Sequence, residues 1–360
     1  MTTPSTLPVI IIGAGQSGLA AARAVRARGL EPLVLEAGDR PVGSWPSYYE
    51  SLRLFSPARY SGFPGFGFGG DPDRYPARDE VVAHLQRYAD HLGVEVRTGT
   101  RAVAVEPAEA GFVVRTDDGV ELDASGVIAA TGSFANPVRS SVAGLERFAG
   151  RVMHAAQYRE PSPFAGQRVV VVGGGNSGVQ IAYELAQVSD VTLATREPVV
   201  FAVQRPLGRD VHFWFRVTGF DRFPPAVLRR VVRGPLVLDT GAYRSALEDG
   251  TVDTRAMFTE VEQDEVVWAD GTREHVDALV LATGYRPALG YLGDLAGLDE
   301  RGVPRQRGGV SLVRPGLGFV GLELQRSFAS NTLRGVHRDA AHVAAAVGAH
   351  ARTVRTLTRS

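Results

Sequence analysis

The sequence predicts an α/β protein of two Rossmann-like domains, with the second domain inserted into the first. Two glycine-rich turns, Gly13 to Gly18 and Gly173 to Gly178, each follow a short apolar run and precede a segment with helical periodicity. In each half a later apolar run ends in Ala-Thr-Gly. Since the same order of motifs occurs twice, we expect residues 1–150 and 286–360 to form one domain and residues 151–285 the other.

The composition is that of a globular protein and narrows the possible chemistry. All 39 basic side chains are Arg and balance 39 acidic side chains, so the net charge of zero predicts no general attraction to nucleic acid or to a membrane. The absence of cysteine excludes a disulfide, a thiolate metal site and a redox-active cysteine pair, and no other metal-binding spacing is present. The first residues hold no apolar stretch long enough for a signal or a membrane span, so the expected location is the cytoplasm.

The first glycine-rich turn has the features of a dinucleotide site rather than of a structural turn alone. Its glycines allow a tight turn, the approach of backbone amides to a pyrophosphate and the packing of the helix on the strand. The next apolar run ends at Glu36, whose carboxylate can accept hydrogen bonds from both ribose hydroxyls of FAD or NAD. The turn residues assigned to the cofactor are Gly13, Gly15, Gln16, Ser17 and Gly18.

The chain between this turn and the first Ala-Thr-Gly is expected to contain an aromatic loop, a helix and a β-meander. Residues 51–76 are rich in Gly, Pro and aromatic residues. Their rings either wall an apolar approach for a substrate or pin the loop to the core. Asp79 to Leu92 has helical spacing. Three alternating runs then predict the meander: Val94 to Arg97, Ala102 to Glu106 and Phe112 to Thr116.

The second glycine-rich turn differs from the first at one informative position. Arg196 lies as far beyond Gly178 as Glu36 lies beyond Gly18, so an acid is replaced by a guanidinium. A guanidinium suits a phosphate monoester, so with Thr195 it predicts a site that prefers NADPH to NADH, unless Arg196 is simply a surface arginine. The turn residues assigned to this site are Gly173, Gly175, Asn176, Ser177 and Gly178.

The remaining elements complete the two domains. Residues 197–250 are expected to pack within the second domain, with short helices at Ala226 to Val232 and Gly241 to Leu247. A second small meander precedes the second Ala-Thr-Gly. The chain then returns to the first domain with a last strand at Gly318 to Gly321 and a helix from Thr332 to Ala346.

Between the two turns lies a third motif, Phe148 to Arg159, which reads F-x-G-x3-H-x3-Y-R. It resembles the fingerprint of class B flavoprotein monooxygenases, in which one chain binds FAD and NADPH in two dinucleotide folds. The Tyr-Arg ending favours the flavin-containing and N-hydroxylating branches over the Baeyer-Villiger branch, which ends the motif with Trp. The resemblance implies FAD at the first turn, NADPH at the second and a coupling role for His154. It also implies that Tyr158 and Arg159 contribute to the cofactor sites, although Arg159 could instead cap the linker.

The same resemblance assigns further positions. Gly43, Ser44 and Trp45 look like the family's segment beside the flavin nucleotide, with a half-buried core aromatic as the alternative for Trp45. Ser56 stands where some members carry an Asn near the reactive flavin position, and it is the second catalytic candidate beside His154. The other positions assigned to cofactors are the strand ends Ala130, Thr131, Gly132, Thr283 and Gly284. Many two-nucleotide flavoproteins carry Gly-Asp after the last strand, with the Asp on the ribityl chain. Here Gly321 is followed by Leu322, so Gln325 is the candidate and the ribityl-binding residue stays open.

The resemblance implies that NADPH reduces the FAD and that O2 forms a C4a-(hydro)peroxyflavin, which oxygenates a small soft nucleophile at sulfur or nitrogen. Alternatives are Baeyer-Villiger oxygenation of ketones, a reductase that passes electrons from NADPH through FAD to a partner, and a nucleotide-binding protein without catalysis. The expected partners are a small-molecule substrate and O2, with neither nucleic acid nor membrane, and a homodimer stays open.

Overall fold

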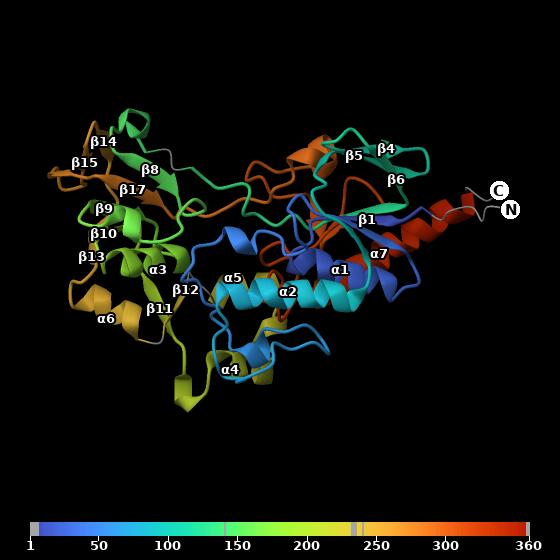
Figure 1. The fold of residues 1–360 in the computed structure, drawn as a ribbon, viewed down its shortest axis with the longest axis horizontal. Helices are drawn as coiled ribbons and strands as arrows, with labels where there is room; N and C mark the ends of the chain where they lie inside the picture. The colour runs from blue at the N-terminus through green and yellow to red at the C-terminus, as the bar shows by residue number, and fades with distance from the viewer. Residues whose placement is uncertain (1–6, 140–141, 232–235, 240, 358–360) are drawn as a thin grey trace.

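The computed structural model describes residues 7–139, 142–231, 236–239 and 241–357, and Figure 1 shows two α/β bodies joined by a narrower middle. The chain enters the first body, passes through the second and returns, so the predicted fold class of two Rossmann-like domains, one inserted into the other, is confirmed. No helix in the described ranges is long and apolar enough to cross a bilayer. The same residues contain no cluster of three or more His, Cys, Asp or Glu side chains suited to a metal ion.

The first body is built on a seven-stranded sheet in the order β18-β19-β20-β7-β1-β2-β3. The strands from β20 to β3 are parallel, and β18 and β19 add an antiparallel edge. The strands β1, β2 and β7 are buried along their whole length, as expected for a sheet covered on both faces. The bounds are β1 Val9–Ile12, β2 Pro32–Leu35, β3 Glu95–Arg97, β7 Gly126–Ala129, β18 Gln306–Arg307, β19 Val310–Ser311 and β20 Leu317–Phe319.

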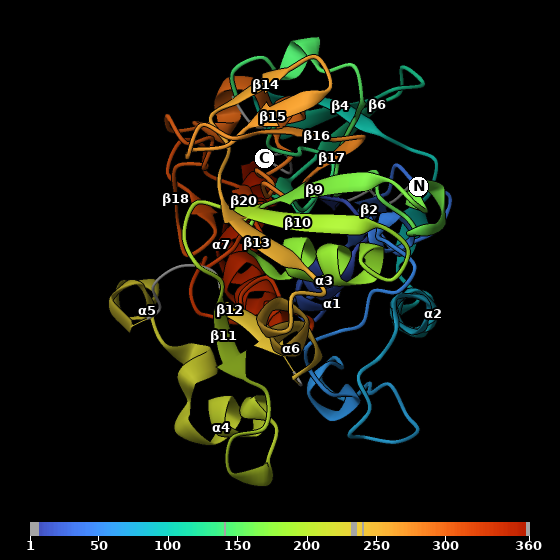
Figure 2. The ribbon, with the colours of Figure 1, turned by 90° about the vertical axis from the view of Figure 1, so that its left-hand side faces the viewer.

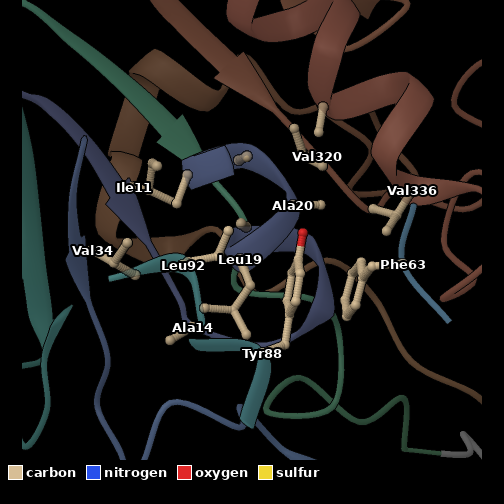
Figure 3. Close-up of a cluster of buried hydrophobic side chains, with 14 of the residues drawn as sticks. Ile11, Ala14, Leu19, Ala20, Val34, Phe63, Tyr88, Leu92, Val320 and Val336 are labelled. Atoms are coloured by element: carbon tan, nitrogen blue, oxygen red, sulfur yellow. The ribbon is translucent and has the colours of Figure 1, made fainter. Parts of the chain in front are cut away.

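Three helices cover this sheet. Figure 3 shows side chains of strands and helices meeting in one core, among them Ile11, Leu19, Tyr88 and Val336. The last helix packs on the first helix and is longer than the sequence predicts. The bounds are α1 Gln16–Arg26, α2 Arg78–Leu92 and α7 Val336–Leu357.

The second body is built on a parallel sheet of five strands in the order β13-β10-β9-β17-β8. A helix, α3, follows its glycine turn and packs on β9 and β10. The bounds are β8 Arg151–His154, β9 Arg168–Val172, α3 Asn176–Leu185, β10 Asp190–Thr195, α6 Ala242–Glu248, β13 Asp253–Ala256 and β17 Ala278–Leu281.

Each body carries a small antiparallel sheet. The second forms as expected from β14 Glu260–Glu262, β15 Glu265–Val267 and β16 Arg273–His275. The first differs, because the run after the helix becomes β3 of the large sheet. The meander consists of β4 Ala102–Ala108, β5 Gly111–Thr116 and β6 Glu121–Ala124. A strand of three residues carries too little pattern to show which sheet it joins.

The aromatic loop is pinned to the first body. Phe63 and Phe68 are buried, and their rings stack on Tyr88 and His84 of α2 with centroids 3.9 Å apart in both pairs. Of the two alternatives for these rings, the packing role therefore describes their position.

Short 3-10 helices lie at η1 Trp45–Ser47, η2 Ala58–Tyr60, η3 Leu145–Arg147, η4 Ser162–Phe164, η5 Pro206–Gly208, η6 Phe220–Arg222 and η7 Gly290–Ala296.

The prediction that residues 197–250 pack within the second domain is wrong for residues 204–223, which dock on the first body. Arg334 forms a buried two-pronged ion pair with Asp221, and Phe328 packs edge-on against Phe215 and Phe220. Such long-range contacts leave no local pattern in the sequence. The described part of residues 197–250 contains β11 Val200–Val203, α4 Val211–Thr218, α5 Pro225–Val231 and β12 Leu236–Asp239, besides η5, η6 and α6.

Two linkers join the bodies and bind each other. After each Ala-Thr-Gly the chain crosses to the other body, and the two crossings run antiparallel. The amide of Val138 donates to the carbonyl of Gly284 at 3.0 Å, and that of Ala288 donates to Gly132 at 2.9 Å. Gly132 and Gly284 have φ of +64° and +86°, which only glycine adopts without strain.

Candidate active site

The two glycine turns have the same local construction. A Cβ on Gly13 would lie 2.7 Å from the Ala130 carbonyl oxygen, and a Cβ on Gly173 would lie 2.4 Å from the Ala282 carbonyl oxygen. The first glycine of each turn therefore packs against the alanine of the Ala-Thr-Gly that follows. The helix then starts with Gly15 or Gly175 as its N-cap, and neither N-cap has a side chain that covers the free amides.

A second loop crosses over the first turn. Gly43 has φ of +56°, and a Cβ there would lie 2.7 Å from the Gly15 Cα atom. Trp45 donates its indole N–H to the Gln16 side-chain oxygen at 2.8 Å. The structure thus brings the predicted segment Gly43 to Trp45 onto the start of α1, where the sequence analysis places the flavin nucleotide.

Glu36 is held at the end of β2 with only 7% of its surface exposed. Its carboxylate accepts hydrogen bonds from the amides of Ala14 at 2.6 Å and Gly38 at 2.9 Å. Each carboxylate oxygen has two lone pairs, so acceptor capacity for ribose hydroxyls remains. The glycine contacts and this buried carboxylate fit the adenosine end of FAD.

Beside the second turn lies a cavity of about 630 Å³ at the ends of β10 and β13. Arg196 and Thr195 line it as the sequence predicts, and so do Arg244 of α6 and Arg255. The Arg255 guanidinium is engaged with Asp270 and lies over Trp268, whereas neither Arg196 nor Arg244 forms an ion pair with the described residues. Two cations are therefore available to a phosphate group here.

Sequence reasoning missed Arg244. It lies far along the chain from the glycine turn, and its guanidinium is held over the Phe201 ring at 5.3 Å. Only the fold brings α6 beside the end of β10, and nothing in the local sequence could identify this residue.

One segment of the first body reaches into the second. Tyr49 is buried in the core of the second body, where its hydroxyl donates to the side-chain oxygen of Gln180 on α3. Four residues earlier, Trp45 is bonded to Gln16 at the start of α1. We call Trp45 to Tyr49 the connector, because it links the two helices that follow the glycine turns, at the first residue of α1 and the fifth residue of α3. The sequence analysis did not single out Tyr49.

Arg159 of the fingerprint binds this connector. Its guanidinium donates to the Tyr48 carbonyl oxygen at 3.1 Å, and its own carbonyl oxygen accepts from the Glu50 amide at 2.9 Å. This position matches the linker-capping alternative, because the guanidinium donates its hydrogen bonds to backbone carbonyl oxygens.

His154 ends β8 and is buried. Its Nδ1 accepts from the Ala156 amide at 3.1 Å, so a neutral ring carries its proton on Nε2, for which the described residues supply no hydrogen-bond partner. Burial lowers the pKa of His154. A neutral ring at this place suits packing between strand and linker rather than proton transfer at neutral pH.

A row of aromatic rings connects His154 to the connector. Tyr285 meets the edge of the His154 ring at 5.0 Å and stacks on Phe134 at 5.6 Å. Phe134 contacts Tyr48 at 4.5 Å, and Tyr48 contacts Trp45 at 5.5 Å. The rings come from both linkers, the connector and the fingerprint, so these four pieces of chain share one packed junction.

The side chains of several other predicted site residues form hydrogen bonds within the protein. The hydroxyls of Thr131 and Thr283 donate to carbonyl oxygens of the opposite linkers, at Ala288 and Val138 respectively. The Gln325 side-chain oxygen accepts from the Leu322 amide, and its side-chain nitrogen donates to the Phe319 carbonyl oxygen. Ser56 hydrogen-bonds Ser61 at 2.7 Å, and Asn176 accepts from the Leu238 amide.

Tyr158 has no exposed surface. Its hydroxyl donates to Glu184 of α3 at 3.0 Å, inside the second body. Burial raises the pKa of Glu184. Any effect of Tyr158 on a cofactor would therefore pass through α3.

Comparisons with known proteins agree with this arrangement. The sequence model of the family described as pyridine nucleotide-disulphide oxidoreductase matches residues 10–216. An indole-3-pyruvate monooxygenase, YUCCA1 of Oryza sativa subsp. japonica, is 32% identical over 77% of this chain and 76% of its own. An uncharacterized CzcO-like oxidoreductase of Geobacillus kaustophilus is 28% identical over 93% of this chain and 96% of its own. The solved flavin-containing monooxygenase from Stenotrophomonas maltophilia superposes with a TM-score of 0.84 and 32% identity, covering 96% of this chain and 98% of that one.

Proposed function

We propose a substrate class for this chain, which belongs to the pyridine nucleotide-disulphide oxidoreductase family and, within it, to the flavin-dependent monooxygenases. It is an oxidoreductase whose cofactors are FAD and NADPH. In the proposed reaction one atom of O2 is transferred to a small soft nucleophile, a sulfide or an amine, and the other leaves as water. The Tyr158-Arg159 ending of the fingerprint supports this class.

The roles of the protein residues follow from their positions. The turn at Gly13 and the Glu36 carboxylate would hold the adenosine and pyrophosphate of FAD, with the connector crossing over that turn. Arg196 and Arg244 would hold the 2′-phosphate of NADPH at the cavity beside β10. When bound, the reduced flavin supplies the chemistry that activates O2. The protein orients the two cofactors and excludes water from the junction between them.

The junction between the two bodies supports the coupling of an FAD site to an NADPH site, on which any such oxygenation depends. A single connector is bonded to the start of α1 through Trp45 and to the fifth residue of α3 through Tyr49. Hydride transfer requires the two reactive rings at a fixed separation, and a displacement of about 1 Å can cost about 100-fold in rate. The connector is placed to hold the two nucleotide turns at a fixed distance.

The experiment is turnover of the purified yellow protein with NADPH under 18O2, in the presence of an aryl methyl sulfide, a tertiary amine or a cyclic ketone. We expect 18O in the sulfoxide or N-oxide, with one NADPH consumed per product. A labelled lactone from the ketone alone would move the assignment to Baeyer-Villiger oxygenation. Hydrogen peroxide without a labelled product, together with reduction of an added acceptor, would identify a reductase.

A further inference from the structure

The segment from Val200 to Arg230 carries a surface that the monooxygenase reaction does not use. Of the fourteen large apolar side chains more than a third exposed in the described ranges, six lie in this short segment. Four of them lie outside the linings of both cavities at the second turn, so a bound nucleotide does not cover them. These four are Leu207, Val217, Phe223 and Val227.

Leu207 is the most exposed of these side chains, at 88%. Its φ is +52°, a conformation that costs a leucine about 1 kcal/mol, and it stands between Pro206 and Gly208. The turn is fixed in place, because the Trp214 indole N–H donates to the Pro206 carbonyl oxygen at 3.0 Å. An apolar side chain is thus held outward on a rigid turn of the chain.

In this segment the described arginine side chains are exposed and the acidic side chains point inward. The exposed charged side chains that the structure describes here are all arginines, namely Arg205, Arg209, Arg216, Arg222 and Arg230. The two acids between Val200 and Arg230 point inward. Asp210 binds Tyr75, Gln204 and His212, and Asp221 binds Arg334. The segment therefore presents positive charge alone, although the whole chain has none in excess.

The same segment projects from the molecule. Figure 2 shows α4 and α5 extending beyond the two large sheets, α4 at the lower edge of the view and α5 at its left edge. The inner side of α4 docks on the first body through Phe215, which leaves Val217, 64% exposed, and the neighbouring turn on the outside. A convex projection of this kind suits a broad, deformable surface better than it suits an extended groove-binding partner.

We propose that this projection, made of Leu207, Val217, Phe223, Val227 and the arginines around them, docks on an anionic lipid bilayer. Aliphatic and aromatic side chains enter the boundary between headgroups and acyl chains, while arginines remain at the level of the lipid phosphates. Each cation near such a surface adds to the binding, and the attraction fades within a Debye length. A second copy of the chain fits less well, since a two-fold contact would place the arginines of one copy against those of the other.

The docking does not depend on the chemistry proposed above. The inner side of α4 packs on the first body, where its rings contact Tyr60 and Phe328.

The test is co-sedimentation of the FAD-loaded protein with vesicles of phosphatidylcholine alone or mixed with about a third phosphatidylglycerol. We expect at least about tenfold stronger binding to the anionic vesicles, weakened by raised salt. Leu207→Ser should weaken it about fivefold, and Arg205→Gln with Arg209→Gln by more. The matched control is Leu312→Ser with Arg301→Gln, an exposed pair on the first body that should bind as the unchanged protein does.

Three results would overturn the proposal. The protein could fail to bind either vesicle. The control could weaken binding as much as the Leu207 and Arg205 variants. Light scattering could reveal a dimer that Leu207→Ser dissociates, which would assign the projection to a second copy. Flavin content and the thermal unfolding temperature of each variant show that a change in binding is not a change in fold.

Discussion

The hydroxyl of Tyr49 donates a hydrogen bond to the side-chain oxygen of Gln180, although the two residues belong to different nucleotide-binding bodies. Tyr49 is buried against the helix that follows the second glycine turn, and Trp45 of the same connector is bonded to the helix that follows the first. The separation of the two turns is therefore set by a few residues of one segment.

Removal of that hydroxyl should slow hydride transfer more than it weakens either cofactor. We expect Tyr49→Phe to lower the anaerobic rate of flavin reduction by NADPH about tenfold, because the nicotinamide is less well placed. Bound FAD and the dissociation constant of NADP+ should change by less than about threefold. Tyr183→Phe, a ring beside the same core, is the control. An unchanged reduction rate in Tyr49→Phe would reject the role of the connector, whereas failure of the unchanged protein to be reduced would reject the proposed function.

Arg196→Ala should change cofactor preference. Loss of a guanidinium from a phosphate site is expected to raise the KM for NADPH by about 10- to 100-fold and to leave the KM for NADH within about twofold. Arg244→Ala should act in the same direction, since its side chain lines the same cavity. Equal effects on the two nucleotides would show that these arginines do not contact the 2′-phosphate.

The buried ion pair between Asp221 and Arg334 should contribute strongly to the attachment of the segment around α4. Arg334→Ala leaves a buried carboxylate without its partner, with an expected loss of about 3–5 kcal/mol in the free energy of unfolding. Asp221→Leu combined with Arg334→Met should recover much of this loss. Arg115→Ala, which breaks an exposed pair with Glu121, serves as control and should cost less than about 1 kcal/mol. A cost for Arg334→Ala no larger than that of the control would contradict the prediction.

His84 should make the protein sensitive to mild acid. Burial lowers the pKa of His84 to about 4, and neither ring nitrogen has a hydrogen-bond partner in the described structure. Between about pH 6.5 and pH 4 the unfolded chain binds a proton that the folded chain does not, so stability falls as the pH falls through this window. His84→Phe keeps the stacking on Phe63 and Phe68 and should reduce the loss of melting temperature between pH 7 and pH 5.

The exposed His91 on the same helix gives the control, as His91→Gln. Some acid sensitivity should persist in His84→Phe, because burial also lowers the pKa of His337 to about 4. An identical pH dependence of the melting temperature in His84→Phe and the unchanged protein would contradict this account.

The sequence analysis succeeded where structure is set by neighbours in the chain. Both glycine turns and both Ala-Thr-Gly strand ends are local patterns, because a tight turn next to a strand leaves few choices of residue. Tyr49 and Arg244 were missed since their importance arises from contacts more than forty residues away in sequence. The same holds for Thr131 and Thr283. The sequence could not show that their hydroxyls donate hydrogen bonds to carbonyl oxygens of the opposite linkers.

Net charge says little about any single surface for a related reason. A total of zero predicts no general attraction to a membrane, but the total counts Asp210 and Asp221 as though they were exposed. Once both acids are turned inward toward their partners, the exposed charged side chains described between Val200 and Arg230 are all arginines. Composition reports how many charges a chain has and is silent about which of them the fold removes from the surface.

The paired linkers constrain how the two bodies can move. Two antiparallel strands joined by hydrogen bonds, as at Val138 with Gly284 and Ala288 with Gly132, form a ribbon with one stiff and one compliant direction. Such a ribbon bends across its flat face at little cost, but sliding one strand past the other would break every bond between them. Motion of one nucleotide turn against the other is thereby restricted to a bending coordinate with its axis across the ribbon, and the glycines at its ends are the natural positions for the bend.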